Sequence, residues 1–488
     1  MTMTEPSSRR IEVSVLARVE GEGGLEVSIR DDRIEHLALR IFEPPRFFEQ
    51  FLVGHHYSEI PDLVARICGI CPVAYQMSGV SAIERLFALD APRDPEGDSK
   101  KHSGAPHSEP ETGRNSQTDK GPYNPPGSRP DSQRNSVSGS QRDSELAPWV
   151  RRMRRLFYCG EWIQSHALHI HLLAAPDFLG FDSAIAMAAS HGDELRRGLA
   201  LQAFGNRIIA LLGARSVHPV GARVGGFWHA PALSDVAAVA AEAERAVPAA
   251  EALLRWTAAL PLPQQPQHFN CVSLRHPLEY PMMAERIVAE SGLDISVDDF
   301  EAHFSEHQVP HSTALHGLLE GEPYLVGPLA RVNLNQDRLH PRVQALLTEL
   351  GIDFPSHDMA QSVIARAVEI LQAALEAAEI LADVAPQTPA YAELAPRAGI
   401  ARGVSEAPRG LLWHRYDLDA DGLIQQARIV PPTSQNQARI EADLAQTLTR
   451  IGLNADADRL RQAGEQVIRN YDPCISCATH FLRLTLNR

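Results

Sequence analysis

The chain has 488 residues, of which 44% are hydrophobic and 22% are charged. This balance is typical of globular domains and excludes a wholly disordered or fibrous chain, and the length allows two to four domains or one large enzyme domain with appendages. The formal net charge of −15 makes nucleic acid an unfavourable partner, because an acidic surface repels phosphate.

The first segments of the chain predict β-structure. Apolar and polar residues alternate along 11–17, 25–30 and 33–41, as the strands of a small antiparallel sheet require. Helical spacing of apolar residues then predicts helices over about 73–89, 149–174, 193–212, 233–259 (bent at Pro248) and 358–385. A hairpin is expected near 411–430, around Asp421-Gly422. The predicted fold class is mainly α, with small peripheral β-sheets on a bundle of long helices.

One stretch, residues 94–148, differs from the rest in composition. It consists of Ser, Pro, Gly, Asn, Gln and charged residues and is nearly free of aliphatic side chains, so it cannot bury enough surface to offset its ordering entropy. We expect a disordered insertion there, with a docking tail as the alternative. It would separate an N-terminal region, 1–93, from a helical core, 149–480.

No apolar run approaches the length of a membrane span, and the first residues, MTMTEPSSRRIEVSV, contain no apolar core of a secretory signal. A cytoplasmic location is therefore expected, where cysteines stay reduced.

The six cysteines comprise two CxxC pairs, Cys68 with Cys71 and Cys474 with Cys477, and two single residues expected in the core, Cys159 and Cys271. Four thiolates suit zinc, an iron–sulfur cluster or another soft metal site. Because the two pairs are so far apart in the sequence, one site formed by both would hold distant parts of the chain together.

Several motifs, in order along the chain, resemble those of the large, catalytic subunit of nickel–iron hydrogenases. The two strongest are Arg66-Ile-Cys-Gly-Ile-Cys71 and Asp472-Pro-Cys-Ile-Ser-Cys-Ala-Thr-His480. The further similar blocks are Arg18-Val-Glu20-Gly21, Phe48-Glu49, SHALHIHLLAAPDF with His166, His169 and Asp177, Gly213-Ala-Arg-Ser-Val-His218-Pro219, and Ala407-Pro408-Arg409-Gly410. The resemblance implies that family's fold over nearly the whole chain outside 94–148.

The resemblance also implies ligands and an activity. Cys68 and Cys474 would bind nickel terminally, while Cys71 and Cys477 would bridge it to an iron that carries carbon monoxide and cyanide. The reaction would be reversible heterolytic cleavage of H2 to protons and electrons. The proton would pass to Cys474 or to Arg409, although an arginine is better suited to stabilise charge than to act as a base.

Further residues gain roles from the same resemblance. Glu20 would carry protons out, a role that suits a carboxylate because burial can raise its pKa. Glu49 and His480 would hold magnesium, with the backbone carbonyl of Gln437 as a third ligand. The residues expected to surround the cofactor are Asp177, Pro408, Arg409 and Asp472. The remaining histidines, His166, His169, His171 and His218, are expected to be hydrogen-bonded core residues.

One position departs from the family pattern. Most members carry His four residues after the second cysteine, whereas this chain has Tyr75, which cannot exchange a proton near neutrality as imidazole can. The motif surroundings are most similar to the soluble cytoplasmic branch that exchanges electrons with NAD(P).

Two alternatives remain at this point: a quinone-side subunit similar to that of respiratory complex I, whose relatives lack the four cysteines, and a non-catalytic zinc-bound scaffold. With only Cys159 and Cys271 outside the site, the chain cannot carry its own iron–sulfur relay. The expected partners are a small subunit with iron–sulfur clusters, flavin/NAD(P) diaphorase subunits, and a maturation protease with accessory proteins. The protease is expected to remove residues 481–488 as a propeptide.

Overall fold

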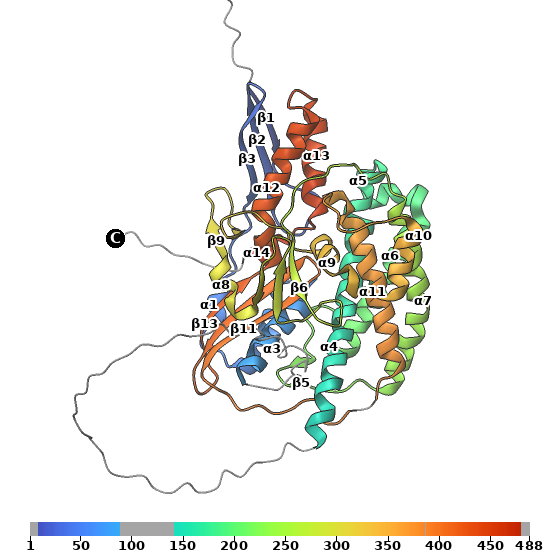
Figure 1. Ribbon diagram of the computed structural model, residues 1–488, viewed down its shortest axis with the longest axis vertical. Helices are drawn as coiled ribbons and strands as arrows, with labels where there is room; N and C mark the ends of the chain where they lie inside the picture. Colours follow the sequence, from blue (N-terminus) through green and yellow to red (C-terminus); the bar gives the residue numbers. More distant parts are fainter. Residues whose placement is uncertain (1–7, 88–140, 386, 480–488) are drawn as a thin grey trace, which may run out of the picture.

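The computed structural model describes residues 8–87, 141–385 and 387–479. Four long helices lie side by side in one part of the molecule (Figure 1): α4 (Gln141–Leu168), α6 (Ala184–Gly213), α7 (Leu233–Ala258) and α11 (Ser362–Ala382). Two shorter helices, α5 (Ala175–Leu179) and α10 (Pro341–Leu350), flank this bundle. The predicted helical core is confirmed.

The central helix of the bundle is α11. Seventeen of its residues are buried, including the charged Arg366 and Glu369, so the helix has neighbours on every side, unlike an amphipathic surface helix. Helix α7 continues through Pro248 as one helix. The break in regular backbone geometry lies instead in α6, at His191, with φ −125° and ψ 36°.

The N-terminal sheet is antiparallel, as the alternation predicted, with β1 (Ser8–Val13), β2 (Gly23–Arg30) and β3 (Arg33–Ile41) in that order. The helices α1 (Phe48–Leu52), α2 (Ile60–Val64) and α3 (Pro72–Phe87) follow. The predicted hairpin is present as β12 (Gly410–Leu418) and β13 (Ile424–Val430), and β11 (Gly399–Ala407) extends it to three strands. Helix α3 packs against β11 and β12.

The remaining small elements connect these parts. They are the strand pair β4 (Ala222–Arg223) and β5 (Gly226–Phe227), the sheet of β6 (Val272–Arg275), β7 (Arg286–Ala289) and β8 (Asp294–Ser296), the pair β9 (Phe304–Gln308) and β10 (Leu315–Leu319), and the helices α8 (Phe300–His303) and α9 (Pro328–Asn335). The chain ends with α12 (Pro432–Ile451), α13 (Ala457–Asn470) and α14 (Ile475–Ala478).

Two predicted segments fall mainly outside the described residues. Of the predicted insertion, 94–140 is not described, whereas 141–148 forms the first turns of α4, so this helix begins at Gln141 and not at 149. His480 and the predicted propeptide, 481–488, also lie outside the described residues. The expected disorder, magnesium binding and processing therefore stay predictions.

Within the described chain, no single helix has both the length and the apolar character needed to cross a membrane. The bent pair Ala147–Leu179 and Ala184–Gly213 meets those two requirements only when both halves are counted together across a bend of 107°.

Candidate metal centre

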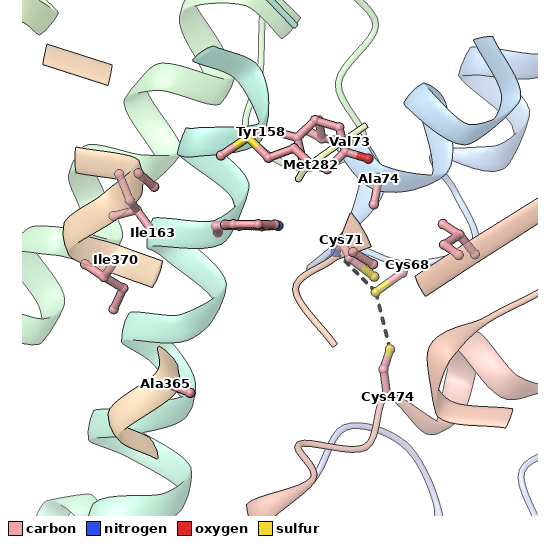
Figure 2. Packing of buried hydrophobic residues seen from close by; sticks show 14 of the residues in the cluster. Cys68, Cys71, Val73, Ala74, Tyr158, Ile163, Met282, Ala365, Ile370 and Cys474 are labelled. Carbon is pink, nitrogen blue, oxygen red and sulfur yellow. Dashed lines mark hydrogen bonds between the residues drawn. The ribbon is translucent and has the colours of Figure 1, made fainter. Parts of the chain in front are cut away.

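The two CxxC pairs meet in one buried site although about 400 residues separate them. The Sγ atoms of Cys68 and Cys474 are 3.5 Å apart and those of Cys71 and Cys477 are 3.6 Å apart. All four sulfurs lie within 4.8 Å of one another. Figure 2 shows Cys68 and Cys71 reaching toward Cys474 from the other end of the chain. The predicted gathering of four thiols is therefore present.

Local backbone structure positions the first pair. The amides of Ile70 and Cys71 donate to Cys68 Sγ over 3.3 and 3.4 Å, and α3 begins directly after Cys71. The buried Glu161 carboxylate accepts from the amides of Val73 and Ala74 in the first turn of α3, over 2.6 and 3.0 Å. A helix N-terminus has unpaired amides, and here a side chain of α4 satisfies two of them.

The second pair is held by the segment between β1 and β2 and by α12. Cys474 forms a parallel bridge with Glu20, and the amide of Cys474 donates to Thr433 Oγ1 over 3.0 Å. Arg46 donates to the carbonyl of Ile67, over 2.7 Å, and to that of Ser476. One guanidinium thus ties the backbones of both cysteine motifs together.

Sequence reasoning missed Glu161, Arg46 and Thr433 because none belongs to a recognised motif. Their contacts are to backbone atoms of the motifs, and such contacts leave no spacing pattern. The one available signal was a glutamate, Glu161, in an otherwise apolar helical stretch, since a charge in such a place requires partners.

Arg409 supplies positive charge to the site. Its guanidinium donates to the carbonyl of Asp472 over 2.7 Å and to its carboxylate over 3.0 Å, and both side chains are buried. Burial alone would lower the pKa of Arg409, but Asp472 and the nearby thiols raise it well above its ordinary value. Arg409 therefore stays a cation.

A second buried arginine positions the loop that carries Arg409. Arg331 donates to the carbonyls of Ala407 and Pro408 over 2.7 and 3.0 Å, and it forms ion pairs with Glu369 and Glu406 at 2.7 and 3.1 Å. This network explains why α11 buries Glu369: through Arg331 it helps to fix the backbone beside Pro408 and Arg409.

The thiols compete for protons because they are close together and buried. Hydrogen bonds from the other three thiols lower the pKa of Cys68 well below its usual value, whereas burial and the same neighbours raise the pKa of Cys474 well above it. Four thiolates at this spacing need more positive charge than Arg409 provides, so the donor set fits a bound metal group.

Glu20 lies against the second pair. Its Oε2 is 3.1 Å from Cys474 Sγ and accepts from the amide of Ser476 over 3.1 Å, and its backbone carbonyl accepts from Ile475 over 3.0 Å. Glu20 is half-buried, so its carboxylate connects the sulfur of Cys474 with the more exposed segment between β1 and β2.

Asp177 lies between two arginines. Its carboxylate pairs with Arg18 and, at 2.7 and 3.0 Å, with Arg469. Arg18 precedes Glu20 by two residues and Arg469 precedes Cys474 by five. The contacts of Asp177 thus brace the two segments that carry Glu20 and Cys474.

The predicted magnesium residues are only partly brought together. The carboxylate of Glu49 accepts from the backbone amide of Ile429 over 2.7 Å, which brings β13 to Glu49. Gln437 lies on α12, fully buried, and its side-chain amide has no hydrogen-bond partner among the described residues. His480 lies outside the described residues.

Tyr75, at the position where the family pattern has His, is buried beside the thiols. Burial and the four cysteines raise its pKa well above the ordinary value, so it stays a neutral phenol. The ring of His414 on β12 lies 5.7 Å from the Tyr75 ring, so an imidazole is present nearby from another element.

The four histidines expected to be core residues all have hydrogen bonds. Their partners are Glu369 for His166 and the backbone carbonyls of Arg469, Ala167 and Ala65 for His169, His171 and His218.

Comparison with known proteins gives one consistent picture. A family described as nickel-dependent hydrogenase matches residues 316–480. Sulfhydrogenase 2 subunit alpha of Pyrococcus furiosus is 27% identical over 476 residues, covering 97% of this chain and 100% of the relative. The NAD-reducing hydrogenase HoxS subunit beta of Cupriavidus necator is 25% identical, covering 97% and 95%. A crystal structure of an NAD⁺-reducing NiFe-hydrogenase in the H2-reduced state matches with a TM-score of 0.77 at 25% identity, covering 98% and 100%.

Proposed function

Because this chain is the catalytic large subunit of a nickel–iron hydrogenase, we propose that Cys68, Cys71, Cys474 and Cys477 are the ligands of its nickel–iron group. The observation that carries the proposal is the buried cluster of four sulfurs within 4.8 Å of one another. By the resemblance, Cys68 and Cys474 are the terminal nickel ligands and Cys71 and Cys477 the bridging ones.

Polar atoms around the cluster support a group that carries further acceptor atoms, such as carbon monoxide and cyanide on iron. Arg409 Nη1 and Ser434 Oγ are buried donors without a hydrogen-bond partner in the described part of the chain. Ser434 follows Thr433, which accepts from the Cys474 amide. Buried donors normally have partners, so these two suit such ligands.

Held by Cys68, Cys71, Cys474 and Cys477, a nickel–iron group would supply the polarisation of H2 and the capacity to accept its electrons. The residues of the chain manage charge and protons. Cys474 Sγ, 3.1 Å from Glu20 Oε2, is within reach of a carboxylate that can take its proton outward. Arg409, a fixed cation, stabilises negative charge at the site, with Asp472 and Pro408 holding it in place.

A magnesium ion near Glu49 and the C-terminal segment is part of the same proposal. Carboxylate oxygen is the ligand that magnesium prefers, and Glu49 lies at the backbone of β13. Gln437 and His480 stay candidate ligands from the sequence.

Electrons must leave for a partner, because the two remaining cysteines, Cys159 and Cys271, are single and fully buried. Gly69, between Cys68 and Cys71, is exposed. Its neighbour Val217 is 54% exposed, and a side-chain Cβ added to Gly69 would lie 3.7 Å from Val217 Cγ1. The centre thus comes close to the surface here. We place the iron–sulfur small subunit at this face and, given the NAD-reducing relative, expect diaphorase subunits beyond it. Cytoplasmic location and C-terminal processing stay predictions.

The test is a pair of variants. Cys474→Ser replaces a soft ligand by a hard hydroxyl, so nickel content and H2 uptake with an artificial electron acceptor should both fall to background. Cys159→Ser changes a buried thiol outside the cluster and should retain most of both. Equal losses in the two variants would mean that the ligand set is wrong.

A further inference from the structure

A second cluster of metal-ligating side chains lies apart from the four cysteines. Among the described residues, two groups of His, Cys, Asp or Glu bring their ligand atoms within 4.8 Å of one another: the cysteines, and His311, His316 and Glu441. His311 Nε2 is 2.8 Å from Glu441 Oε1, and His316 Nδ1 is 3.8 Å from Glu441 Oε2.

The three side chains come from two separate parts of the chain. His316 is on β10, His311 is in the segment that precedes it, and Glu441 is on α12, two turns after Thr433. The side chain of His316 is 7% exposed, and those of His311 and Glu441 are 23% and 19% exposed. The cluster therefore has a buried inner ligand and two outer ligands that water can reach.

The hydrogen bonds of the cluster are incomplete. Glu441 Oε1 accepts from the backbone amide of Leu39 over 2.9 Å as well as contacting His311. His316 Nε2 is buried and has no partner among the described residues. An imidazole buried at 7% exposure normally uses both nitrogens. Here Nδ1 faces Glu441 at 3.8 Å, beyond hydrogen-bond distance, and Nε2 has no partner in the described structure, so His316 has capacity to bind a further group.

We propose that His311, His316 and Glu441 bind a divalent transition-metal ion, zinc in the first instance. Two imidazoles and one carboxylate are a ligand set that zinc uses when it keeps an open position for water. Two ligand atoms bound to one zinc at tetrahedral angles are about 3.4 Å apart, between the 2.8 and 3.8 Å found here. The ligand atoms of His311 and His316 lie within 4.8 Å of each other, so the two imidazoles draw closer together when they bind the ion.

The site would fasten α12 to the N-terminal sheet. Leu39 of β3 donates to Glu441, and the amide of Thr313, between the two histidines, donates to the carbonyl of Ile41 over 2.8 Å. The first turn of α12 holds Cys474 through Thr433. A metal here stabilises the helix that supports the cysteine centre without touching that centre, so the inference does not depend on the proposed function.

The experiment uses the complete enzyme with its nickel–iron group in place, which keeps the cysteines occupied. After treatment with a chelator, zinc is titrated back against a chromophoric competitor, and X-ray absorption at the zinc edge identifies the ligands. We expect about one zinc per chain with only nitrogen and oxygen neighbours, and Glu441→Gln should weaken binding by at least about 100-fold.

A matched control is available in His303, which pairs with Glu320 at 3.1 Å and has no third ligand in the described structure. His303→Ala should bind zinc like the unmodified enzyme. His311→Ala, at a partly exposed position, replaces Glu441→Gln if that variant fails to fold, as judged by circular dichroism. Sulfur neighbours at the zinc edge, no bound zinc, or equal binding by all variants would overturn the proposal and leave a hydrogen-bonded His–Glu cluster.

Discussion

Among single residues, Glu20 is the one whose contacts bear most directly on proton transfer. Its carboxylate touches the Cys474 sulfur and the Ser476 amide. Glu20→Gln keeps the acceptor for that amide but cannot take up a proton. We expect nickel content to be unchanged and H2 uptake to fall by ~10²–10⁴, the usual contribution of a positioned acid or base.

The control for this prediction is Glu22→Gln. Glu22 is two residues away and exposed, so the same change of charge there should leave H2 uptake nearly unchanged. If Glu20→Gln retains full activity, protons leave by another route. If it loses nickel instead, Glu20 acts by holding the Cys474 segment in place.

Residue-level prediction from the sequence succeeded where chemistry imposes spacing. Two CxxC pairs predicted one four-sulfur site, and the sulfurs do lie together. The ion pairs of Asp177 with Arg18 and Arg469 were not predictable, because they depend on how distant segments pack. The role of Arg46 was not predictable for the same reason: its partners are carbonyls of Ile67 and Ser476, and every residue has a carbonyl.

At the level of elements, the π-helical turn His169–Ala174 between α4 and α5 buries the imidazoles of His169 and His171, and burial lowers the pKa of both. His171 stacks on Trp256, with ring centroids 5.6 Å apart, and burial lowers its pKa from 6.5 to about 4. The folded protein therefore binds a proton at His171 less readily than the unfolded chain does. Stability from this residue is present above pH 6.5 and is lost as the pH falls toward 4.

This sign gives a pH-dependent prediction for His171→Asn, which keeps a donor for the Ala167 carbonyl but does not titrate. The variant is less stable at pH 7.5 because it loses the stacking. The difference in free energy of unfolding between the unmodified protein and the variant should decrease by roughly 2 kcal/mol between pH 7.5 and 5, because it changes by ~1.4 kcal/mol per pH unit below 6.5. Urea titrations at the two pH values measure it, and a gap independent of pH would show that His171 is not buried as a neutral base.

Strands and turns were predictable from the sequence when their own residues showed the apolar–polar alternation or the turn residues typical of them. The alternation in β2 and β3 and the Asp421-Gly422 turn between β12 and β13 correspond to observed strands. Strand β11 was missed because its sequence, GIARGVSEA, lacks clean alternation. It is a strand because it pairs with β12 over its whole length and packs on α3, which is information that a local window does not contain.

For the whole molecule, the two cysteine motifs bring segments from near the two ends of the chain together at the metal centre. The sequence between α3 and α4 contains few apolar side chains that could pack in a core. Arg154 of α4 and Glu84 of α3 form a two-point ion pair at 2.6 Å, and Glu161 of α4 holds the first turn of α3. The two helices that flank residues 88–140 are therefore fastened to each other at both ends of α3.

These contacts predict the result of replacing residues 94–140 by a Gly/Ser linker of about 20 residues, which reaches roughly 25 Å. Because the described contacts between α3 and α4 come from these two helices themselves, we expect nickel content and the midpoint of thermal unfolding to stay nearly unchanged. Glu84→Ala, which breaks the ion pair and leaves Arg154 half-buried without its partner, should lower the midpoint by several degrees, since loss of one partner leaves an uncompensated charge. Calorimetry and metal analysis of both variants decide the matter. A linker variant that loses nickel would mean that residues 94–140 help to assemble the centre.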